Sequence, residues 1–300
     1  MHFKSYPFFN GHQGAIYTLH QMENTTSFLS GGSDGWLVKW SLYNPALGIN
    51  LATIPGQILS ICYIPAVNAC VVGDLNGVVY WLDLNNPKII PKAFAHHKKG
   101  VFSILYLADH LFTAGGDGVF TKWSIDHQTP LESIRISFKA IRSVAYNKEE
   151  DEFALGCSDG AIYFLDRTSF MVKSGWSACH LHSVFSLVFH PDNERIISGG
   201  RDALLKVWHR KNGELHHVVP AHRFTINHLA LNADGNLLFT ASRDKSIRVW
   251  DALHFKLLLS INGTKNEGHQ NSVNRLLWFE TQQSLISASD DRQIGHWKIF

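Results

Sequence analysis

A histidine, a serine and an aspartate near the start of this sequence have the residue types that a hydrolase needs for nucleophilic catalysis. His12 precedes Ser30, and Asp34 follows four residues later. In that chemistry the serine hydroxyl attacks, the histidine accepts its proton and the carboxylate orients the imidazole. Trp40 stands six residues after Asp34 and adds an N–H donor that a hydrolase does not need. The same residues could therefore form a buried hydrogen-bonded network instead of a catalytic site.

The recurrence of this set along the chain decides between the two interpretations. Five identical nucleophile sites in one chain are implausible, and threonine replaces serine freely among them. An indole donates, a hydroxyl donates and accepts, a neutral imidazole does both and a carboxylate accepts, so each set can satisfy its own buried polar groups. We therefore predict no catalytic residue and five structural networks, the one above and His97, Thr113, Asp117, Trp123; His180, Ser198, Asp202, Trp208; His222, Thr240, Asp244, Trp250; and His269, Ser287, Asp291, Trp297.

The networks belong to a repeat that fills the chain. Seven copies of one phrase end near Trp40, Leu82, Trp123, Leu165, Trp208, Trp250 and Trp297, at intervals of 41 to 43 residues and a last interval of 47. A period near 40 residues is typical of stacked supersecondary units. We expect residues 1–300 to form a single domain of seven repeats, with a tolerated loop insertion at residues 262–267 of the last one.

The second and fourth copies depart from the pattern. Leu82 and Leu165 replace the tryptophan, and neither copy has a histidine at the expected place. An apolar core should take the place of the network there, and Asp159 of the fourth copy is expected to lack a network. Trp81 and Phe164 precede the two leucines and should face the other side of their strands, because side chains alternate along a strand.

Each period has the pattern of four short β-strands. In the sixth period the expected strands are residues 227–231, 237–242, 246–251 and 255–261, separated by turns rich in Asn, Asp and Gly. Short apolar stretches of this kind without helical periodicity indicate an all-β protein. A lone sheet of four strands cannot bury both of its faces, whereas sheets packed radially cover one another and leave only short edges.

The beginnings and ends of the periods carry a more specific signal. Gly11-His12 opens the first period, and Trp250-Asp251 closes the sixth. A Gly-His start and a Trp-Asp end in one repeat resemble the WD-repeat family. The resemblance implies a seven-bladed β-propeller of four-stranded antiparallel blades. It also implies that the N-terminal segment, residues 1 to about 8, supplies the fourth strand of the last blade and closes the ring.

Charge and cysteine content limit the classes of function. The net charge is +2, charged residues make up 17% of the chain, and no basic run occurs, so nucleic-acid binding is not expected. The four cysteines have no Cys-x-x-Cys spacing, which fits a reducing compartment. No apolar segment approaches the ~20 residues that span a membrane, and no signal peptide is evident. We therefore expect a cytoplasmic protein that does not enter a membrane.

The eighteen histidines do not predict a metal site. Five belong to the networks, and the paired ones at 96–97, 180–182 and 216–217 fall in different repeats. No Cys/His spacing matches a zinc module. The Gly-Gly pairs lie in the strand–turn phrase and not before a helix, so no phosphate loop is present. We expect no metal and no cofactor.

Three classes of function remain, of which a non-catalytic scaffold for a partner protein or peptide is favoured by the resemblance. An RNA- or ribosome-associated assembly factor is the first alternative, disfavoured by the charge. An enzyme that uses the central channel is the second, and it would need singular polar residues that break the repeat in one blade. No such cluster occurs in the sequence, so we expect that the protein is not an enzyme. We also expect the chain to be monomeric by itself.

The partner is expected on the face that carries the Gly-His loops and the Asp turns. Relatives in the family commonly bind partners there. The candidate residues follow each histidine position by five, or come just before the turn aspartate: Tyr17, Leu59, Phe102, Arg142, Phe185, Asn227, Asn274, Arg201, Arg243 and Asp290. Our hypothesis is that an apolar side chain of the partner inserts among the three aromatics, while an acidic group meets Arg201 and Arg243. In the alternative interpretation the aromatics only plug the channel mouth and the arginines are solvated.

Overall fold

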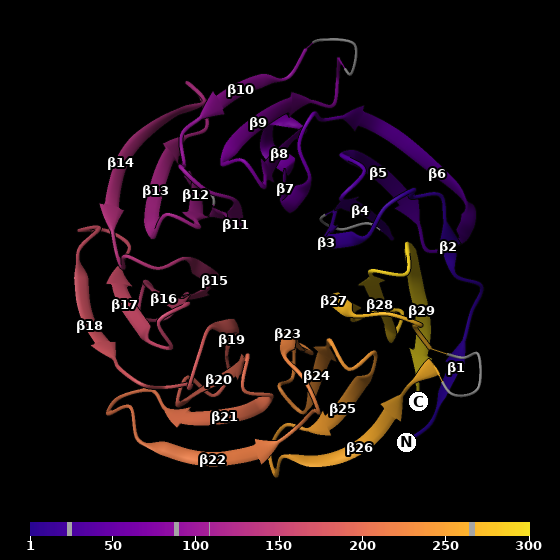
Figure 1. Cartoon of the computed structure of the whole chain (residues 1–300), viewed down its shortest axis with the longest axis vertical. Coiled ribbons are helices and arrows are strands. Elements are labelled where there is room, and N and C mark those ends of the chain that lie inside the picture. The colour runs from indigo at the N-terminus through magenta and orange to yellow at the C-terminus, as the bar shows by residue number, and fades with distance from the viewer. Residues whose placement is uncertain (23–25, 87–89, 108, 264–267) are drawn as a thin grey trace.

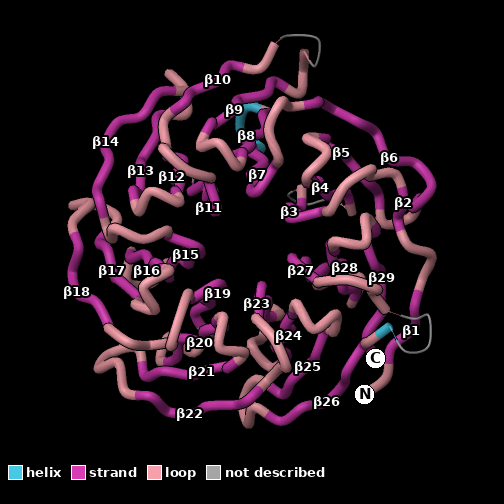
Figure 2. Tube along the Cα trace, in the orientation of Figure 1, coloured by secondary structure: helices cyan, strands magenta, loops and turns pink. Residues whose placement is uncertain are grey.

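The chain folds into a closed ring of seven β-sheets, as the computed structural model shows (Figure 1). The structure describes residues 1–22, 26–86, 90–107, 109–263 and 268–300, so most of the insertion expected at 262–267 lies outside the described residues. In each of the first six sheets the strands follow one another in sequence from the ring axis outward, and every neighbouring pair is antiparallel. Figure 2 shows strands joined by loops with very little helix.

The blades are numbered in chain order. Blade 1 contains β3 (Ile16–Gln21), β4 (Ser27–Gly32), β5 (Trp36–Ser41) and β6 (Asn44–Thr53). Blade 2 contains β7 (Ile58–Ile64), β8 (Ala69–Asp74), β9 (Val78–Asp83) and β10 (Lys92–Ala95), with a short 3-10 helix, η1 (Pro65–Val67), after β7. Blade 3 contains β11 (Val101–Leu107), β12 (His110–Gly115), β13 (Val119–Ser124) and β14 (Thr129–Arg135).

The next three blades repeat this arrangement. Blade 4 contains β15 (Ile141–Asn147), β16 (Glu152–Cys157), β17 (Ile162–Asp166) and β18 (Val172–Trp176). Blade 5 contains β19 (Val184–Phe189), β20 (Arg195–Gly200), β21 (Leu204–His209) and β22 (Leu215–Pro220). Blade 6 contains β23 (Ile226–Leu231), β24 (Leu237–Ser242), β25 (Ile247–Asp251) and β26 (Lys256–Ile261).

Blade 7 combines the two ends of the chain, as the resemblance implied. It contains β27 (Val273–Phe279), β28 (Ser284–Ser289) and β29 (Gln293–Ile299), and its outer strand comes from β1 (Phe3–Ser5) and β2 (Phe9–Asn10). Phe3 pairs with Ile299, and Phe9 pairs with Ile294. Pro7 stands between β1 and β2, where a residue without an N–H cannot donate to the ladder. The predicted closure of the ring by the N-terminal segment is confirmed.

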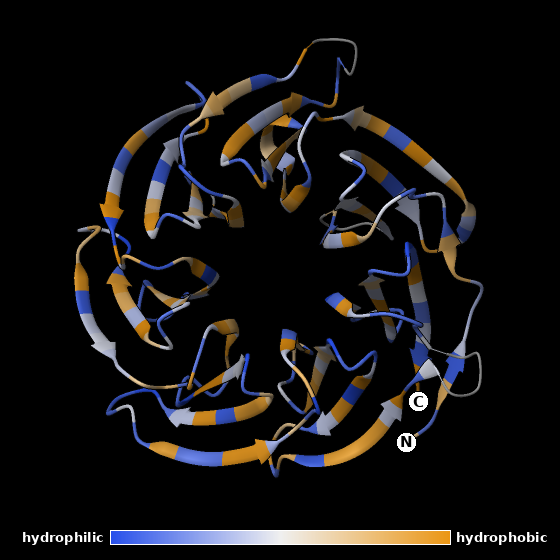
Figure 3. Cartoon of the chain, viewed as in Figure 1, coloured by the Kyte–Doolittle hydropathy of each residue, from blue (hydrophilic) through white to orange (hydrophobic). Residues whose placement is uncertain are grey.

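Burial falls from the second strand of a blade to its fourth. β24 is buried along almost its whole length, whereas β22 is almost entirely exposed. Figure 3 shows apolar and polar residues interspersed along the outer strands, most of whose residues are exposed to solvent at the rim of the ring. The apolar cores therefore lie between adjacent blades.

The two copies without a tryptophan keep their strands and fill the core with apolar side chains. Leu82 packs with Ile61 and Val72 on one side of blade 2. Trp81 packs on the other side, where its ring lies 6.5 Å from that of Trp123 in blade 3. Adjacent residues of β9 thus face opposite neighbours, as the alternation along a strand predicts.

Candidate interaction face at the inner rim

The five predicted network sets lie at one end of the blades. Turns between successive antiparallel strands fall alternately at the two ends, so the histidine-bearing segments and the aspartate turns share one end, the top face. In blade 1, Trp40 Nε1 donates to Ser30 Oγ (2.7 Å), and His12 Nε2 lies 2.7 Å from the same oxygen. His12 Nδ1 lies 2.8 Å from Asp34 Oδ2. The indole, hydroxyl, imidazole and carboxylate thus form one chain.

The same chain recurs with small variations in blades 3, 5, 6 and 7. The distance from histidine Nδ1 to the carboxylate is 3.2, 2.8, 3.0 and 2.8 Å for His97–Asp117, His180–Asp202, His222–Asp244 and His269–Asp291. The distance from histidine Nε2 to the hydroxyl is 2.8, 2.8, 2.7 and 2.7 Å for Thr113, Ser198, Thr240 and Ser287. Trp123, Trp208 and Trp250 donate to the first three of these hydroxyls, and Trp297 is fully buried.

The electrostatics of the networks suit a structural role. Burial alone would raise the pKa of Asp34, but hydrogen bonds from His12 and from the backbone N–H groups of Trp36 and Gln13 outweigh it and lower the pKa. Each carboxylate therefore stays ionised while it holds two backbone segments. Ser30 is fully buried, so a substrate carbonyl cannot reach its hydroxyl, although the imidazole lies at the distance of a general base.

Asp159 of blade 4 corrects one expectation. It was expected to lack a network, yet Ser137 Oγ donates to its Oδ2 at 2.6 Å and the Tyr163 hydroxyl donates at 3.3 Å. Ser137 stands at the place of the missing histidine, so a serine hydroxyl there replaces the imidazole as donor. The presence of a serine at that position was the signal in the sequence, and its donor capacity was overlooked.

Seven of the candidate partner-binding residues occupy one equivalent place in the structure. In every blade the register of the inner strand shifts at its second residue, which is the extra residue of a β-bulge. A bulge bends the strand and re-aims the side chain of that residue. We name these residues the inner rim: Tyr17, Leu59, Phe102, Arg142, Phe185, Asn227 and Asn274.

One side of the inner rim is built around a cation. The Arg142 guanidinium lies 4.0 Å from the ring centroid of Phe102 and 4.5 Å from that of Phe185. Burial lowers the pKa of Arg142 to about 10, and the group remains charged at neutral pH. Arg142 thus fills the space between the two rings, so a partner would meet its guanidinium there and not an open apolar gap.

The other side of the inner rim is polar and internally bonded. Tyr17 is hydrogen-bonded to Ser33, and burial together with the charge of Asp290 raises the pKa of Tyr17. Asn274 Nδ2 donates to Asp290 Oδ1 at 2.7 Å and to Ile16 O at 2.9 Å. The structure therefore places Tyr17 in a different environment from the two phenylalanines.

The remaining candidates lie at the aspartate turns and at the inner rim of blades 2 and 6. Arg201, Arg243 and Asp290 are exposed, and among the described residues neither guanidinium makes a hydrogen bond or an ion pair. Asn227 Nδ2 donates to Val273 O at 2.8 Å and ties blade 6 to blade 7. Leu59 is half-buried and lies beside Gly100. The two arginines are the candidates most accessible to an acidic group.

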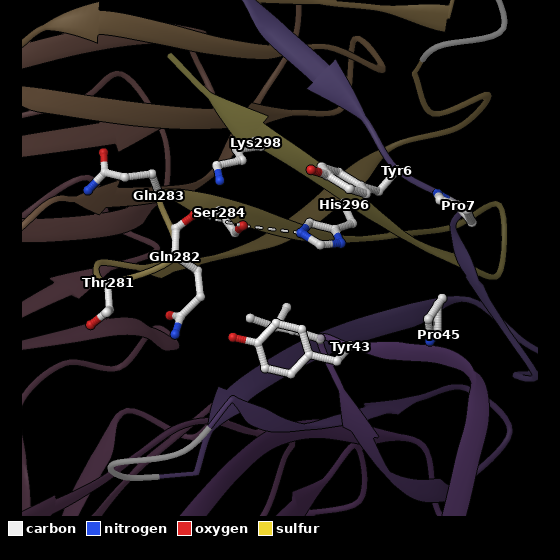
Figure 4. Close-up of a pocket in the computed structure, with 11 residues that line it drawn as sticks. Tyr6, Pro7, Tyr43, Pro45, Thr281, Gln282, Gln283, Ser284, His296 and Lys298 are labelled. Atoms are coloured by element: carbon white, nitrogen blue, oxygen red, sulfur yellow. Dashed lines mark hydrogen bonds between the residues drawn. The ribbon is translucent and has the colours of Figure 1, made fainter.

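Sequence reasoning missed a pocket at the seam of the ring. A cavity of about 730 Å³ lies between blades 7 and 1 and is lined by Tyr6, Pro7, Tyr43 and His296, among others (Figure 4). The His296 ring stacks on Tyr6 at 4.7 Å, and its Nε2 lies 3.2 Å from Ser284 Oγ. The pocket joins residues from both ends of the chain, so no local motif could have predicted it.

Within the described residues, no three or more His, Cys, Asp or Glu side chains lie together in a way that could hold a metal ion. Over the same part of the chain, no helix is both long and apolar enough to span a membrane.

Comparison with known proteins gives the family context. The family model described as "WD domain, G-beta repeat" matches residues 176–209, 213–251 and 262–298. A guanine nucleotide-binding protein subunit beta of Nicotiana tabacum is 22% identical over 307 residues, which cover 96% of this chain and 82% of the relative. The human serine-threonine kinase receptor-associated protein is 22% identical over 249 residues, 82% of this chain and 69% of the relative.

A solved structure shows the same architecture. The WD40 β-propeller domain of Doa1 superposes with a TM-score of 0.87 at 17% sequence identity, covering 99% of this chain and 96% of that one. The match at this identity concerns the fold alone. The family model thus matches the three repeats that form blades 5, 6 and 7, and the chain as a whole folds into a seven-bladed β-propeller.

Proposed function

We propose that the protein is a non-catalytic scaffold that binds a partner protein or peptide on its top face. The observation that carries the proposal is the inner rim, where a β-bulge in each of the seven blades places one residue at the same end of the ring. Aromatic and arginine side chains dominate the energetics of interfaces. The rim brings Phe102, Arg142 and Phe185 together, with Arg201 and Arg243 exposed on the two blades that follow blade 4.

The relatives are consistent with this proposal. One is, by its name, a subunit of a guanine nucleotide-binding protein, and the other is associated with a serine-threonine kinase receptor. Both names describe proteins that act in association with others. Binding of a partner would be non-covalent, because the serine and threonine hydroxyls of the networks are buried and cannot act as nucleophiles on it.

We further infer that residues 1–300 form one domain, because strand β29 pairs with both β1 and β2 and so joins the two ends of the chain.

A cytoplasmic location is proposed from the cysteines. Cys62, Cys70, Cys157 and Cys179 are all unpaired and buried, which suits a reducing compartment. Burial also raises the pKa of the Cys179 thiol to about 11, so it is a poor nucleophile.

The test is quantitative capture of a native partner by variants of the tagged protein. The partner is first identified as the protein enriched from host extract by the wild type, and it is then titrated in purified form. Phe102→Ala and Arg243→Glu should each weaken binding about tenfold or more, which corresponds to about 1.4 kcal/mol.

Matched controls lie at the opposite end of the blades. Leu253→Ala removes an exposed apolar side chain in the β25–β26 turn, and Lys211→Glu reverses an exposed charge in the β21–β22 turn. Both should bind like the wild type. Asn193 is a poorer control, because it has a positive φ of 58° and its side chain accepts a hydrogen bond from Asn147. Loss of binding in the controls, with the top-face variants unaffected, would show that the partner uses the other face.

A further inference from the structure

A basic cleft opens on the top face beside the inner rim. Its volume is about 600 Å³, and it lies between blades 2, 3 and 4. Lys98, Lys99, Lys139 and Arg142 line it together with Phe102 and Phe138, and none of the described residues that line it is acidic. The whole chain has 27 basic and 25 acidic side chains, so this concentration of positive charge is local and does not reflect the average composition.

The backbone beneath the cationic side chains is held in place by the adjacent networks. The Lys98 N–H donates to Asp117 Oδ2 at 2.9 Å, and the Lys139 N–H donates to Ser137 Oγ at 3.0 Å. Both lysine side chains are exposed. The carboxylates of Asp117 and Asp159 are thus engaged with backbone N–H groups and with their own networks, which leaves the lysine ammonium groups available to a ligand.

Arg142 limits which ligand geometry the cleft can accept. Its guanidinium carbon lies over the Phe102 ring at 4.0 Å and over the Phe185 ring at 4.5 Å from the centroids. Among the described residues, the guanidinium has no carboxylate partner. A carboxylate of a ligand can supply this missing partner, since a guanidinium donates two parallel hydrogen bonds to a carboxylate.

Gly116 keeps the cleft open. A Cβ at this position would approach the Phe102 ring and Lys99 Cβ to 2.9 Å, so a larger residue would displace the wall of the cleft. Phe138 forms an apolar edge, because its side chain is 90% exposed and lies under the Arg135 guanidinium at 5.6 Å. An exposed aromatic ring at a cationic cleft offers a contact surface for an apolar side chain next to acidic ones.

We propose that this cleft binds an acidic peptide segment of the partner protein, with a carboxylate on the edge of Arg142, further carboxylates near the three lysines and an apolar side chain against Phe138. The proposal rests on the scaffold function proposed above. The ligand is a peptide and not a nucleic acid, because the four cations of the cleft line a single concave site. Binding along a phosphate backbone needs an extended basic surface, which a net charge of +2 does not favour.

The test uses a short fluorescein-labelled peptide of Glu-Glu-Leu repeats and its Gln-Gln-Leu counterpart, with binding followed by fluorescence anisotropy. The wild type should bind the acidic peptide at least about tenfold more tightly than the neutral one. The double variant Lys98→Glu/Lys139→Glu should lose this preference. The control variant Lys148→Glu/Lys211→Glu changes the net charge by the same amount at exposed sites outside the cleft. This control should keep the preference for the acidic peptide.

Three outcomes would overturn the proposal. These are equal affinity for the two peptides, equal loss in the cleft and control variants, and tighter binding of a single-stranded RNA oligonucleotide of the same charge through the same lysines. Because all four lysines are exposed, the variants should fold, and a thermal melt verifies this. If the cleft variant has no effect while Arg243→Glu still weakens capture of the partner, the scaffold function stands and only the cleft is excluded.

Discussion

The guanidinium group of Arg142 lies 4.0 Å from the ring centroid of Phe102, although the two residues belong to different blades. The contact couples blade 3 to blade 4 at the top face, and Phe185 extends it to blade 5. A cation between rings is stabilised by their π-faces and loses some of its hydration. The same group is thus both a structural link between blades and the proposed hydrogen-bond donor to a partner's carboxylate.

This link predicts a measurable coupling between the two side chains. Phe102→Leu, Arg142→Met and the double variant form a double-mutant cycle, in which the coupling free energy of unfolding should be about 1 to 2 kcal/mol. Urea titrations supply the free energies. Additivity of the two single substitutions within about 0.3 kcal/mol would show that the stacking adds nothing to stability.

The hydrogen-bonded networks predict large losses of stability. Trp250→Ala should cost about 3 to 5 kcal/mol, because the indole is buried and donates to Thr240. Asp244→Asn should cost about 1 to 3 kcal/mol, because an amide N–H would face the donors of His222 and of the backbone. Asp234→Asn, at an exposed turn of the same blade, is the matched control for Asp244→Asn. Network variants indistinguishable from the wild type in urea titrations would contradict the structural role.

Ring closure predicts that the N-terminus is indispensable for stability. Deletion of residues 1–9 removes β1 and leaves β29 as an open edge, so the protein should aggregate or melt at a sharply lower temperature. Phe9→Ala is a milder test, since Phe9 is 1% exposed and packs against Phe28 and Trp40 across the seam. We expect it to cost about 3 to 5 kcal/mol. An unchanged melting curve of the deletion variant would be incompatible with closure by this segment.

His296 predicts a loss of stability in mild acid. Burial lowers its pKa to about 4, whereas an imidazole in the unfolded chain titrates near ~6.5. As the pH falls through this window the unfolded state takes up a proton that the folded state does not bind, so stability decreases. His296→Gln should therefore lose less stability than the wild type between about pH 7 and pH 5, by on the order of 1 to 2 kcal/mol.

Urea unfolding of His296→Gln at the two pH values measures this difference. His127→Gln, at an exposed position, serves as the control and should show the pH dependence of the wild type. If the His296→Gln variant lost as much stability as the wild type, the seam histidine would not be the group responsible. His20, whose pKa burial also lowers to about 4, would then be the next residue to replace.

The amino-acid sequence by itself determined the repeat, the blades and the composition of the networks. Each network joins residues at nearly constant offsets within one period: histidine and aspartate are 22 residues apart in four networks and 20 apart in His97–Asp117. Local turns set these offsets, so the spacing of residue types is enough to predict them. The one miss within a blade, Asp159, came from overlooking that a serine can donate where a histidine is absent.

Only the tertiary structure decided what the top face presents. The sequence placed Phe102, Arg142 and Phe185 at equivalent positions of three blades, but the distance between those blades and the direction of each bulged side chain depend on how the sheets pack around the ring. The seam pocket depends in the same way on ring closure, which brings Tyr6 against His296. Contacts between blades join residues about one period apart or more, and no local pattern of residue types encodes them, because they form only when every blade has folded and the ring has closed.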